Sequence, residues 1–264
     1  MPELPDVEMQ KRYLEETSLQ KRIKRVKVLD DYVIKGLSNS EFVSRLEEAE
    51  FERVERRGKF LKAFTDSEHD LALHFGMTGY LSYAPSSSRY EKYARVVFTF
   101  YQDHDLRYVS KRKLGGLYLV PKGKFNRIAT LKTMGPEPLN PEFDFTKFKT
   151  RVEKRSAMMK ALLLDQSFIA GIGNVYGDEI LFQAGIRPDR KISELGEEEL
   201  TRLFKETKRV LRKAIQRKAR LQGLEDSFLA LHRRKDENCP RCGSRIQRVK
   251  VSGRTSYYCE RCQR

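Results

Sequence analysis

The sequence contains no apolar run near the length of about 18 residues that a membrane helix requires. Its first residues are proline-rich and acidic, whereas a secretory signal needs a basic start and an apolar stretch. Cysteine is absent before residue 239. These absences argue against a membrane-spanning protein and against a disulfide-bonded secreted one. We therefore expect a soluble intracellular protein.

Acidic residues are in the minority. The chain has 53 lysines and arginines against 37 aspartates and glutamates, so its net charge is +16 and its pI is about 9.7. A globular chain this basic most often binds a polyanion, and nucleic acid is the leading candidate. A basic but inert surface is the alternative. The 264 residues suffice for one large or two modest domains with a buried core.

The few cysteines form two Cys-x-x-Cys pairs separated by sixteen residues: Cys239, Cys242, Cys259 and Cys262. Two such pairs can bind one zinc ion with four tetrahedral thiolates. Residues 246–258 alternate apolar and polar side chains and predict a hairpin that turns at Ser252 and Gly253. A disulfide framework is the alternative, which the missing secretory signal disfavours. Four protein ligands close the site, so the predicted Zn2+ is structural and not catalytic.

The first half of the chain is predicted to be rich in β-strands. After a short predicted helix over residues 7–14, turn residues separate seven short segments of strand-like composition. These segments are residues 22–28, 50–56, 60–64, 71–75, 95–101, 106–109 and 117–120. They predict a β-sandwich. Residues 121–141 then contain four of the nine prolines and predict an interdomain hinge.

From residue 145 onward the apolar pattern is helical. Ser156 is predicted to cap a helix that carries Met159. Asn174 is predicted to cap a second helix over residues 175–184. A longer helix follows, with apolar residues on one face between positions 200 and 215 and many lysines and arginines on the other.

Pro2 and Glu3 are candidates for covalent chemistry. If Met1 is removed, Pro2 becomes a secondary amine that titrates near pH ~8 and is partly neutral at physiological pH. Such an amine can attack a carbonyl-level carbon and form an iminium, or Schiff base, intermediate. Glu3 could donate or accept the proton that this chemistry moves. The simpler alternative is that Pro5 merely starts a helix in its first turn.

Four motifs precede the cysteine pairs. They are MPELPDVE at residues 1–8, RGKFL at 57–61, HFGMTG at 74–79 and GIGNVY at 171–176. Together with the two Cys-x-x-Cys pairs, they resemble the formamidopyrimidine-DNA glycosylase (Fpg/Nei) family of base-excision repair enzymes. The resemblance runs from residue 2 to residue 263 and so covers essentially the whole chain.

The resemblance implies an α+β fold with two domains. The first is an N-terminal β-sandwich with a leading helix, expected over residues 1–131. The second joins a helix-two-turn-helix DNA-binding domain over residues 132–226 to a zinc ribbon over residues 227–264. The implied partner is double-stranded DNA with a damaged base, bound by a monomer in a basic cleft between the domains. The implied location is the cytoplasm, in association with the nucleoid.

The resemblance also implies a bifunctional DNA glycosylase and abasic-site lyase for oxidised bases, namely formamidopyrimidines, 8-oxoguanine or related lesions. In such enzymes the damaged nucleotide is flipped out of the duplex. Pro2 would attack the sugar C1′ carbon as the base leaves, and β- and then δ-elimination would cut the strand. Glu3 matches the proton donor of the family, Lys59 the lysine of β-elimination and Arg254 the arginine of δ-elimination.

Other matches concern the DNA contacts. Met77 and Arg112 match residues that fill the gap left by the flipped nucleotide, and Asn174 stands at a helix start, where N–H groups favour a phosphate. The full set of expected contacts is His74, Met77, Tyr93, Arg112, Leu114, Arg155, Lys160 and Asn174. Taken alone, Arg155 and Lys160 are better explained as solvated charges and Asn174 as a helix cap. The simpler account of Met77 is core packing, and that of His74 is a satisfied polar residue.

Several positions depart from the family pattern. Leu114 stands where an intercalating Phe is expected, Tyr93 replaces a His, and Asp6 replaces a Glu. Residues 222–228 are much shorter than the loop that closes over 8-oxoguanine in bacterial Fpg, so formamidopyrimidines, hydantoins or oxidised pyrimidines are the better candidate substrates. Two alternatives stay open: an endonuclease VIII-like enzyme for oxidised pyrimidines, and a non-catalytic zinc-ribbon DNA-binding protein.

Overall fold

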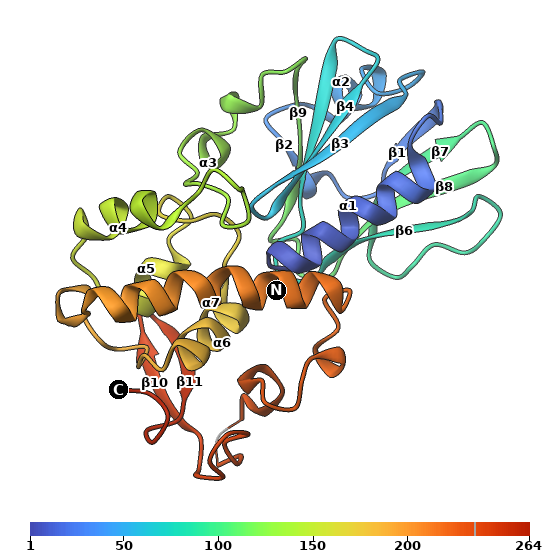
Figure 1. Ribbon diagram of the computed structural model, residues 1–264. Helices are drawn as coiled ribbons and strands as arrows, with labels where there is room; N and C mark the ends of the chain where they lie inside the picture. Colours follow the sequence, from blue (N-terminus) through green and yellow to red (C-terminus); the bar gives the residue numbers. More distant parts are fainter. Residues whose placement is uncertain (235) are drawn as a thin grey trace. The chain divides into compact units, whose positions relative to one another are not determined.

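The computed structural model describes residues 1–234 and 236–264 (Figure 1). The chain forms two compact units: unit 1 comprises residues 1–2 and 6–133, and unit 2 comprises residues 3–5 and 134–264. The change between units at residues 133 and 134 lies inside the predicted hinge. The finer domain boundaries given above stay predictions. Among the described residues, none of the helices combines the length and the apolar composition of a membrane span.

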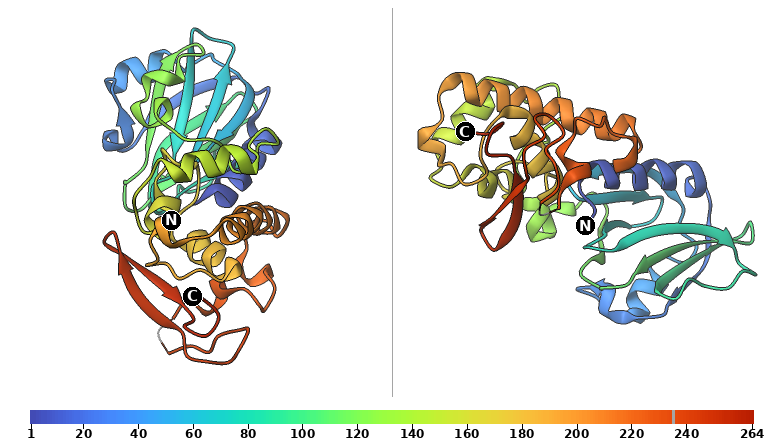
Figure 2. Two further views of the ribbon diagram at one scale, coloured as in Figure 1. Left: turned by 60° about the vertical axis from the view of Figure 1, so that its left-hand side comes forward. Right: turned by 90° about the horizontal axis from the view of Figure 1, so that it is seen from below.

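Unit 1 contains two sheets (Figures 1 and 2). The first is antiparallel, in the order β1 (Ile23–Val28), β7 (Ala94–Phe100), β8 (His104–Ser110) and β6 (Gly79–Pro85). The second has the order β2 (Ile34–Lys35), β9 (Gly116–Pro121), β5 (His69–His74), β4 (Phe60–Thr65) and β3 (Phe51–Arg57). Only β2 and β9 pair in parallel within this sheet. The helical elements are α1 (Leu4–Ser18), η1 (Asp31–Val33), α2 (Asn39–Ser44), η2 (Phe125–Arg127) and α3 (Ala129–Lys132).

One apolar core joins the two sheets of unit 1. Phe98 of β7 and Leu71 of β5 are fully buried members of the same cluster, to which α1 adds Val7 and Leu14. Burial of each such side chain stabilises the fold by about 1.5–3 kcal/mol relative to exposure. The predicted β-sandwich with a leading helix is therefore confirmed. The sequence missed β2, which is too short to give a pattern, and β6, where Tyr80 is exposed and dilutes the apolar signal.

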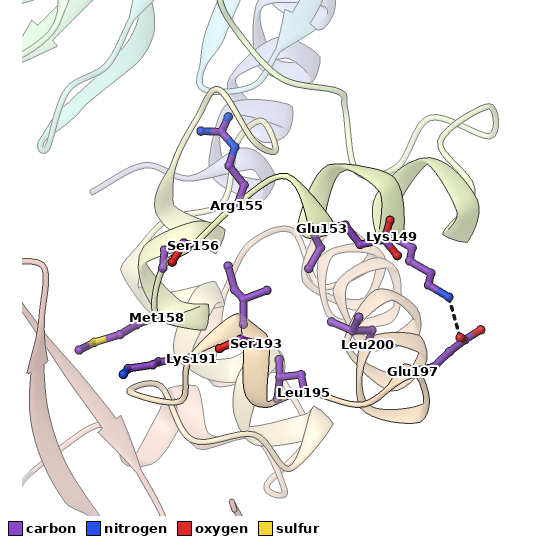
Figure 3. A pocket seen from close by; sticks show the side chains of 13 residues that line it. Lys149, Glu153, Arg155, Ser156, Met158, Lys191, Ser193, Leu195, Glu197 and Leu200 are labelled. Carbon is purple, nitrogen blue, oxygen red and sulfur yellow. Dashed lines mark hydrogen bonds and ion pairs between the residues drawn. The ribbon is translucent and has the colours of Figure 1, made fainter.

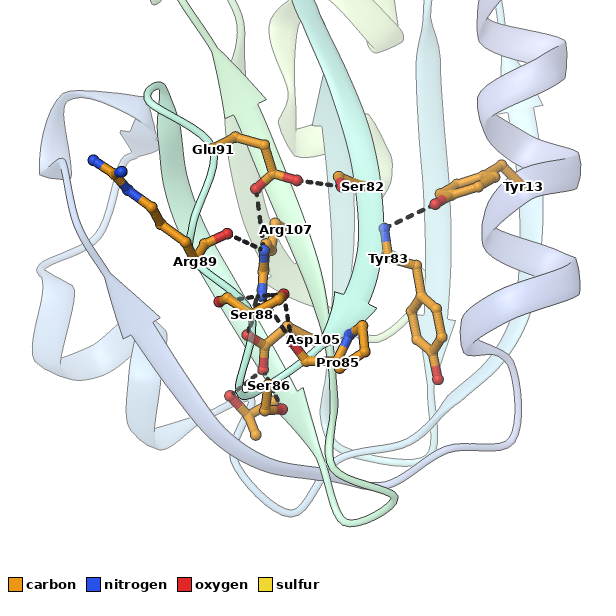
Figure 4. A network of polar contacts seen from close by, with 11 residues as sticks. Tyr13, Ser82, Tyr83, Pro85, Ser86, Ser88, Arg89, Glu91, Asp105 and Arg107 are labelled. Carbon is orange, nitrogen blue, oxygen red and sulfur yellow. Dashed lines mark hydrogen bonds and ion pairs between the residues drawn. The ribbon is translucent and has the colours of Figure 1, made fainter.

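A buried arginine holds the connection between β6 and β7 in place (Figure 4). Arg107 of β8 is 1% exposed, and its guanidinium donates to three main-chain carbonyls of this connection at 3.1, 3.2 and 3.1 Å. Asp105 at 3.2 Å and Glu91 at 3.4 Å provide the opposite charge. Since a buried charge is tolerated only when paired and hydrogen-bonded, this network orders the segment that leads to Tyr93.

Unit 2 is mainly helical and ends in a β-hairpin. Its helices are α4 (Phe145–Glu153), α5 (Met159–Leu164), α6 (Asn174–Ala184) and α7 (Glu197–Gln216), with the short 3-10 helices η3 (Ile192–Glu194), η4 (Leu221–Gly223) and η5 (Leu229–His232). Strands β10 (Gln247–Val251) and β11 (Arg254–Tyr258) form the hairpin. The predicted turn at Ser252 and Gly253 is confirmed, and both residues have positive φ, 47° and 75°, as a tight hairpin turn requires.

The longest helix, α7, is amphipathic as predicted. Its buried residues include Leu200, Leu203, Val210 and Leu211, which recur at the three- and four-residue spacing of one helical face. This face packs against α6. The lysines and arginines of α7 therefore point away from the core that the two helices share.

The start of α5 differs from the prediction. Ser156 is not its cap, because the helix begins at Met159 and Met158 occupies the N-cap position. Met158 is extended and forms an isolated bridge with Lys191, and the Met159 N–H donates to the Arg190 carbonyl at 2.8 Å. The first amide of α5 thus has a tertiary partner, and Ser156 lies outside the helix.

Helix α6 carries a buried carboxyl group. Glu179 is fully buried and accepts hydrogen bonds from the Ala230 N–H and from Gln183 Nε2, both at 2.7 Å. Burial raises the pKa of Glu179 to about 7, although these two hydrogen bonds oppose the rise. The bond to Ala230 ties α6 to η5, which precedes the zinc-binding segment.

The free energy of unfolding of the Glu179→Gln variant is expected to increase relative to that of the wild type as pH rises. With a folded pKa near 7, above the ordinary 4.5, Glu179 contributes stability that is present below pH 4.5 and lost as pH rises through 7. Gln keeps an acceptor for Ala230 and does not titrate. Between about pH 5 and about pH 8 its free energy of unfolding should gain about 2 kcal/mol on the wild type.

Urea unfolding of the zinc-loaded protein at several pH values measures this difference. Glu197→Gln is the matched control, because Glu197 is 67% exposed and its partner Lys149 is also at the surface. If the difference in free energy of unfolding between the wild type and Glu179→Gln stays constant with pH, the raised pKa of Glu179 is contradicted.

Candidate active site

The segment between α5 and α6 makes a tight turn at Gly171. This residue has a φ of +84°, and a Cβ there would lie 2.7 Å from the Leu4 side chain. Gln166 spans the turn: its Oε1 accepts from the Gly171 N–H at 2.8 Å and its Nε2 donates to the Ile172 carbonyl at 2.9 Å. The Leu4 N–H donates to the Gly171 carbonyl at 2.9 Å. The turn therefore binds the start of the chain.

Glu3 caps helix α6 from the other end of the sequence. Its carboxylate accepts hydrogen bonds from the N–H groups of Gly173 (2.7 Å), Val175 (2.8 Å) and Tyr176 (3.3 Å). Glu3 is 1% exposed. Carboxylates are favoured at a helix N-terminus, where unpaired N–H groups and the helix dipole attract negative charge. The carboxylate fits only because residue 173 is glycine, since a Cβ there would lie 2.4 Å from the Glu3 carboxyl carbon.

The predicted capping role of Asn174 is wrong. The N-cap of α6 is Gly173, and the cap hydrogen bonds are made by Glu3. Asn174 is the first helical residue, and its Nδ2 donates to the Thr255 carbonyl of β11 at 2.9 Å. Its buried Oδ1 accepts no hydrogen bond from the part of the chain that the structure describes. The contact of Asn174 with DNA stays a prediction.

Lys160 does not fit the predicted direct contact with DNA. Its side chain is fully buried, and its Nζ donates to Asp178 Oδ1 at 2.6 Å and to the Asn174 carbonyl at 2.8 Å. Burial lowers the pKa of Lys160, while the Asp178 carboxylate acts in the opposite direction. Asp178 also pairs with Arg233 at 2.7 Å. The sequence did not predict these two ion pairs, although two adjacent acids, Asp178 and Glu179, inside the otherwise apolar helix α6 were a signal.

Arg254 is exposed at the start of β11. Its neighbour Thr255 accepts the hydrogen bond from Asn174, and Asn174 begins the helix that Glu3 caps. Three candidate residues of unit 2, Glu3, Asn174 and Arg254, are thus connected through α6 and β11.

Arg155 lines a pocket of about 620 Å³ in unit 2 (Figure 3). Its guanidinium is exposed, donates to Ser167 Oγ at 3.3 Å and lies 3.6 Å from Asp165. The ion pair between Lys149 and Glu197, 2.6 Å long, stands at the opposite end of the pocket (Figure 3). Of the predicted site residues, Arg155 alone lines this pocket.

In unit 1, His74 ends strand β5, and Lys59 directly precedes the neighbouring strand β4 of the second sheet. Lys59 lies in the β3–β4 turn, where Gly58 has a φ of +56°. The next residue, Phe60, pairs with His74, and their rings are 4.7 Å apart. Burial and then the nearby Lys59 charge lower the pKa of His74 to about 4. His74 is therefore neutral near pH 7 and adds no charge to a phosphate site.

Two loops of unit 1 touch where β5 ends and β9 begins. Gly76 has a φ of +60°, and a Cβ there would lie 2.4 Å from the Gly115 nitrogen. Across the same contact, the Arg112 N–H donates to Thr78 Oγ1 at 3.0 Å. The two loops expose Met77, by 38%, and Leu114, by 55%. The structure thus brings Met77, Arg112 and Leu114 together.

The last two predicted residues are Tyr93 and Pro2. Tyr93 is half-buried, and the cations of Lys92, Arg95 and Lys111 lie 5.6–5.9 Å from its ring. Pro2 is half-buried and directly precedes Glu3. Because Glu3 is held by α6, the positions that the Pro2 nitrogen can take are restricted.

Comparison with protein families accounts for most of this chain. Residues 1–117 match the formamidopyrimidine-DNA glycosylase N-terminal domain, and residues 134–225 match the formamidopyrimidine-DNA glycosylase H2TH domain. The enzyme of that name from Geobacillus kaustophilus is 37% identical over 275 aligned residues, which cover 100% of both chains. The chain belongs to the formamidopyrimidine-DNA glycosylase family.

Other members of the formamidopyrimidine-DNA glycosylase family agree over the same length. The enzyme from Pelotomaculum thermopropionicum is 35% identical and covers 100% of this chain and 99% of its own. Among solved structures, Lactococcus lactis Fpg with DNA containing an abasic site superposes with a TM-score of 0.90, and its complex with an oxidised pyrimidine with a TM-score of 0.91. Both are 29% identical and cover 99% of each chain. The predicted α+β fold is confirmed.

The cysteine pairs form the family's metal site. Residues 236–264 match the zinc finger found in FPG and IleRS, and the four cysteine sulfurs lie within 4.8 Å of one another. Sγ atoms of Cys239 and Cys262 are 3.8 Å apart, and those of Cys242 and Cys259 are 3.5 Å apart. Four thiolates at Zn–S distances of about 2.3 Å form a tetrahedron with edges of about 3.8 Å, so the residues fit zinc. The protein has one structural zinc ion, as predicted.

Gly173→Ala is expected to destabilise the protein more than Gly196→Ala. Both glycines are helix N-caps with negative φ. Because alanine is less favourable than glycine at an N-cap, both variants lose a similar amount of stability for this reason. Only at position 173 does the added Cβ displace Glu3, whereas nothing lies within 4 Å at position 196. The extra loss should be about 1–3 kcal/mol, because three N–H groups lose their acceptor. Urea unfolding of the two variants compares the losses, and equal values would contradict the fit described for Glu3.

Proposed function

We propose that this protein is a bifunctional DNA glycosylase and abasic-site lyase, in which Pro2 is the nucleophile and Glu3 moves the protons. The observation that carries the proposal is the capping of α6 by the Glu3 carboxylate. It holds a buried acid next to the residue that becomes the N-terminus once Met1 is removed. Neither folding nor DNA binding requires a nucleophilic amine beside a buried carboxylate.

The solved relatives support the substrate class. Structures of Lactococcus lactis Fpg contain DNA with Fapy-dG, with an oxidised pyrimidine or with an abasic site. These ligands share a damaged or absent base in DNA. The net charge of +16 suits the same partner.

The chemistry begins when the neutral Pro2 amine attacks C1′ of the flipped nucleotide. The bond from C1′ to the base breaks and the base leaves with the electron pair. The N–H proton of Pro2 passes to the Glu3 carboxylate. The C1′–O4′ bond then opens, Glu3 returns this proton to O4′, and an iminium joins Pro2 to C1′. The iminium acidifies the C2′ proton, whose removal expels the 3′ phosphate by β-elimination. The following δ-elimination expels the 5′ phosphate.

The remaining residues hold the DNA for these steps. Lys59 assists β-elimination, and Arg254 contacts the phosphate that leaves in δ-elimination. Met77, Arg112 and Leu114 fill the gap left by the flipped nucleotide, and their common position on two touching loops supports this role. The other proposed contacts are His74, Tyr93, Arg155 and Asn174.

Formamidopyrimidines and oxidised pyrimidines are the proposed lesions of first choice. The segment from Leu221 to Phe228 is short, and two of its apolar side chains are anchored, Leu224 at 6% and Phe228 at 0% exposure. An anchored segment has little freedom to close over a flipped base. Recognition of 8-oxoguanine depends on such a loop. The short segment therefore favours lesions whose recognition depends on it less.

Borohydride trapping tests the proposal. The protein, with removal of Met1 verified by intact mass, is mixed with duplexes that carry a formamidopyrimidine, an oxidised pyrimidine, 8-oxoguanine or an abasic site. Reduction should fix the iminium as a stable covalent adduct. A variant with one extra residue before Pro2 should form at least about 100-fold less adduct, because its proline nitrogen is an amide.

The same variant controls for binding, because its affinity for a duplex with an uncleavable abasic-site analogue should stay close to that of the wild type. The order of adduct yields among the lesions gives the substrate preference. Tight DNA binding with no adduct on any duplex would contradict the proposed catalysis. The protein would then be a non-catalytic DNA-binding protein.

A further inference from the structure

Asp178 of α6 is the centre of a buried polar cluster that the proposed chemistry does not use. It is 1% exposed. One carboxylate oxygen accepts from Lys160 Nζ at 2.6 Å. The other accepts from Arg233 Nε at 3.0 Å and Nη2 at 2.7 Å, and from the Tyr257 N–H at 3.2 Å. One carboxylate thus binds two cations and one main-chain amide.

These contacts join the first turns of α6 to strand β11. Tyr257 lies on β11, so its N–H fixes the strand against Asp178. Lys160 and Arg233 also donate to the Asn174 carbonyl, at 2.8 and 3.3 Å. The Asn174 side chain donates to Thr255, the residue after Arg254. The cluster therefore contacts the strand on which Arg254 lies and the residue that begins α6.

Asp178 cannot be replaced by a neutral group without conflict. Lys160 is fully buried and Arg233 is 15% exposed, so without the carboxylate two cations with little access to water would face each other. The Lys160 ammonium already lies against the main chain of α6, because a Cβ on Gly177 would be 2.8 Å from its Nζ. Loss of the charge should move Arg233 or β11 and leave the rest of α6 in place.

We propose that Asp178 is a positioning residue for strand cleavage: through Tyr257 it sets the place of β11 and hence of Arg254. This inference rests on the proposed function, in which Arg254 acts in δ-elimination. Asp178 touches neither the sugar nor the base, and its effect should appear in the second elimination and much less in formation of the Pro2 adduct.

A purely structural role of Asp178 makes a different prediction. If the cluster only stabilised the fold, its loss would lower the melting temperature and the amount of active protein. The ratio of δ- to β-elimination products formed by the folded enzyme would not change. The product ratio therefore separates positioning from stability.

The experiment uses zinc-loaded, Met1-free protein at saturating concentration on a duplex with an abasic site, and separates the two cleavage products on a gel. For Asp178→Asn the δ-to-β ratio should fall about tenfold, because a displacement of about 1 Å costs up to about 100-fold in rate. The borohydride adduct should stay within about twofold of the wild type. Glu197→Gln, which breaks an exposed ion pair of the same unit, is the control and should leave the ratio unchanged.

A double-mutant cycle locates the effect. Arg254→Ala should lower the ratio by itself, and adding Asp178→Asn to it should lower the ratio no further, since both changes act through the same side chain. If Asp178→Asn does not fold, Arg233→Met takes its place. That variant keeps the buried pair of Lys160 and Asp178 and should also lower the ratio.

If folded Asp178→Asn gives the wild-type ratio of δ- to β-elimination products, the proposal is wrong. It is also wrong if the fall in this ratio caused by Asp178→Asn simply adds to the fall caused by Arg254→Ala. Both outcomes differ from failure of the proposed function. In that case the wild type itself would give neither adduct nor cleavage products.

Discussion

The interaction on which the candidate site depends is the capping of α6 by Glu3. Three main-chain N–H groups bind one buried carboxylate, and they determine where Glu3 lies within unit 2. Two glycines make the contact possible: Gly171 takes a positive φ beside Leu4, and Gly173 leaves space for the carboxylate. The same motif therefore serves the fold, by satisfying a helix end, and the proposed chemistry, by fixing the acid next to Pro2.

Helix α6 extends this organisation through unit 2. Beyond its first turn, Asp178 binds β11, and Glu179 binds the segment before the zinc site. At its C-terminal end, Gly185 accepts a hydrogen bond from the last residue of the chain, and Gln263 donates to the Ile186 carbonyl at 2.7 Å. An eleven-residue helix thus contacts the N-terminus, the zinc hairpin and the C-terminus. This explains why so many polar residues of α6 are buried.

Local patterns were predictable from the sequence, and contacts between distant residues were not. The strands, the amphipathic α7 and the Cys-x-x-Cys zinc site follow from spacing within a few residues. The cap of α6 was assigned to Asn174 because the true acceptor, Glu3, lies 170 residues away from Gly173 in the sequence. Lys160 was predicted to contact DNA because of the family resemblance, and only its ion pair with Asp178, eighteen residues on, explains its burial.

The most direct test of this account is the single-turnover rate at which Gly173→Ala releases a formamidopyrimidine from a duplex. If the Glu3 cap positions the reacting groups, that rate should fall by at least about tenfold relative to Gly196→Ala, because the added methyl displaces the carboxylate. DNA affinity and zinc content should match in the two variants. Equal excision rates in the two folded variants would contradict the account, since the proposed chemistry would then not depend on where α6 holds Glu3.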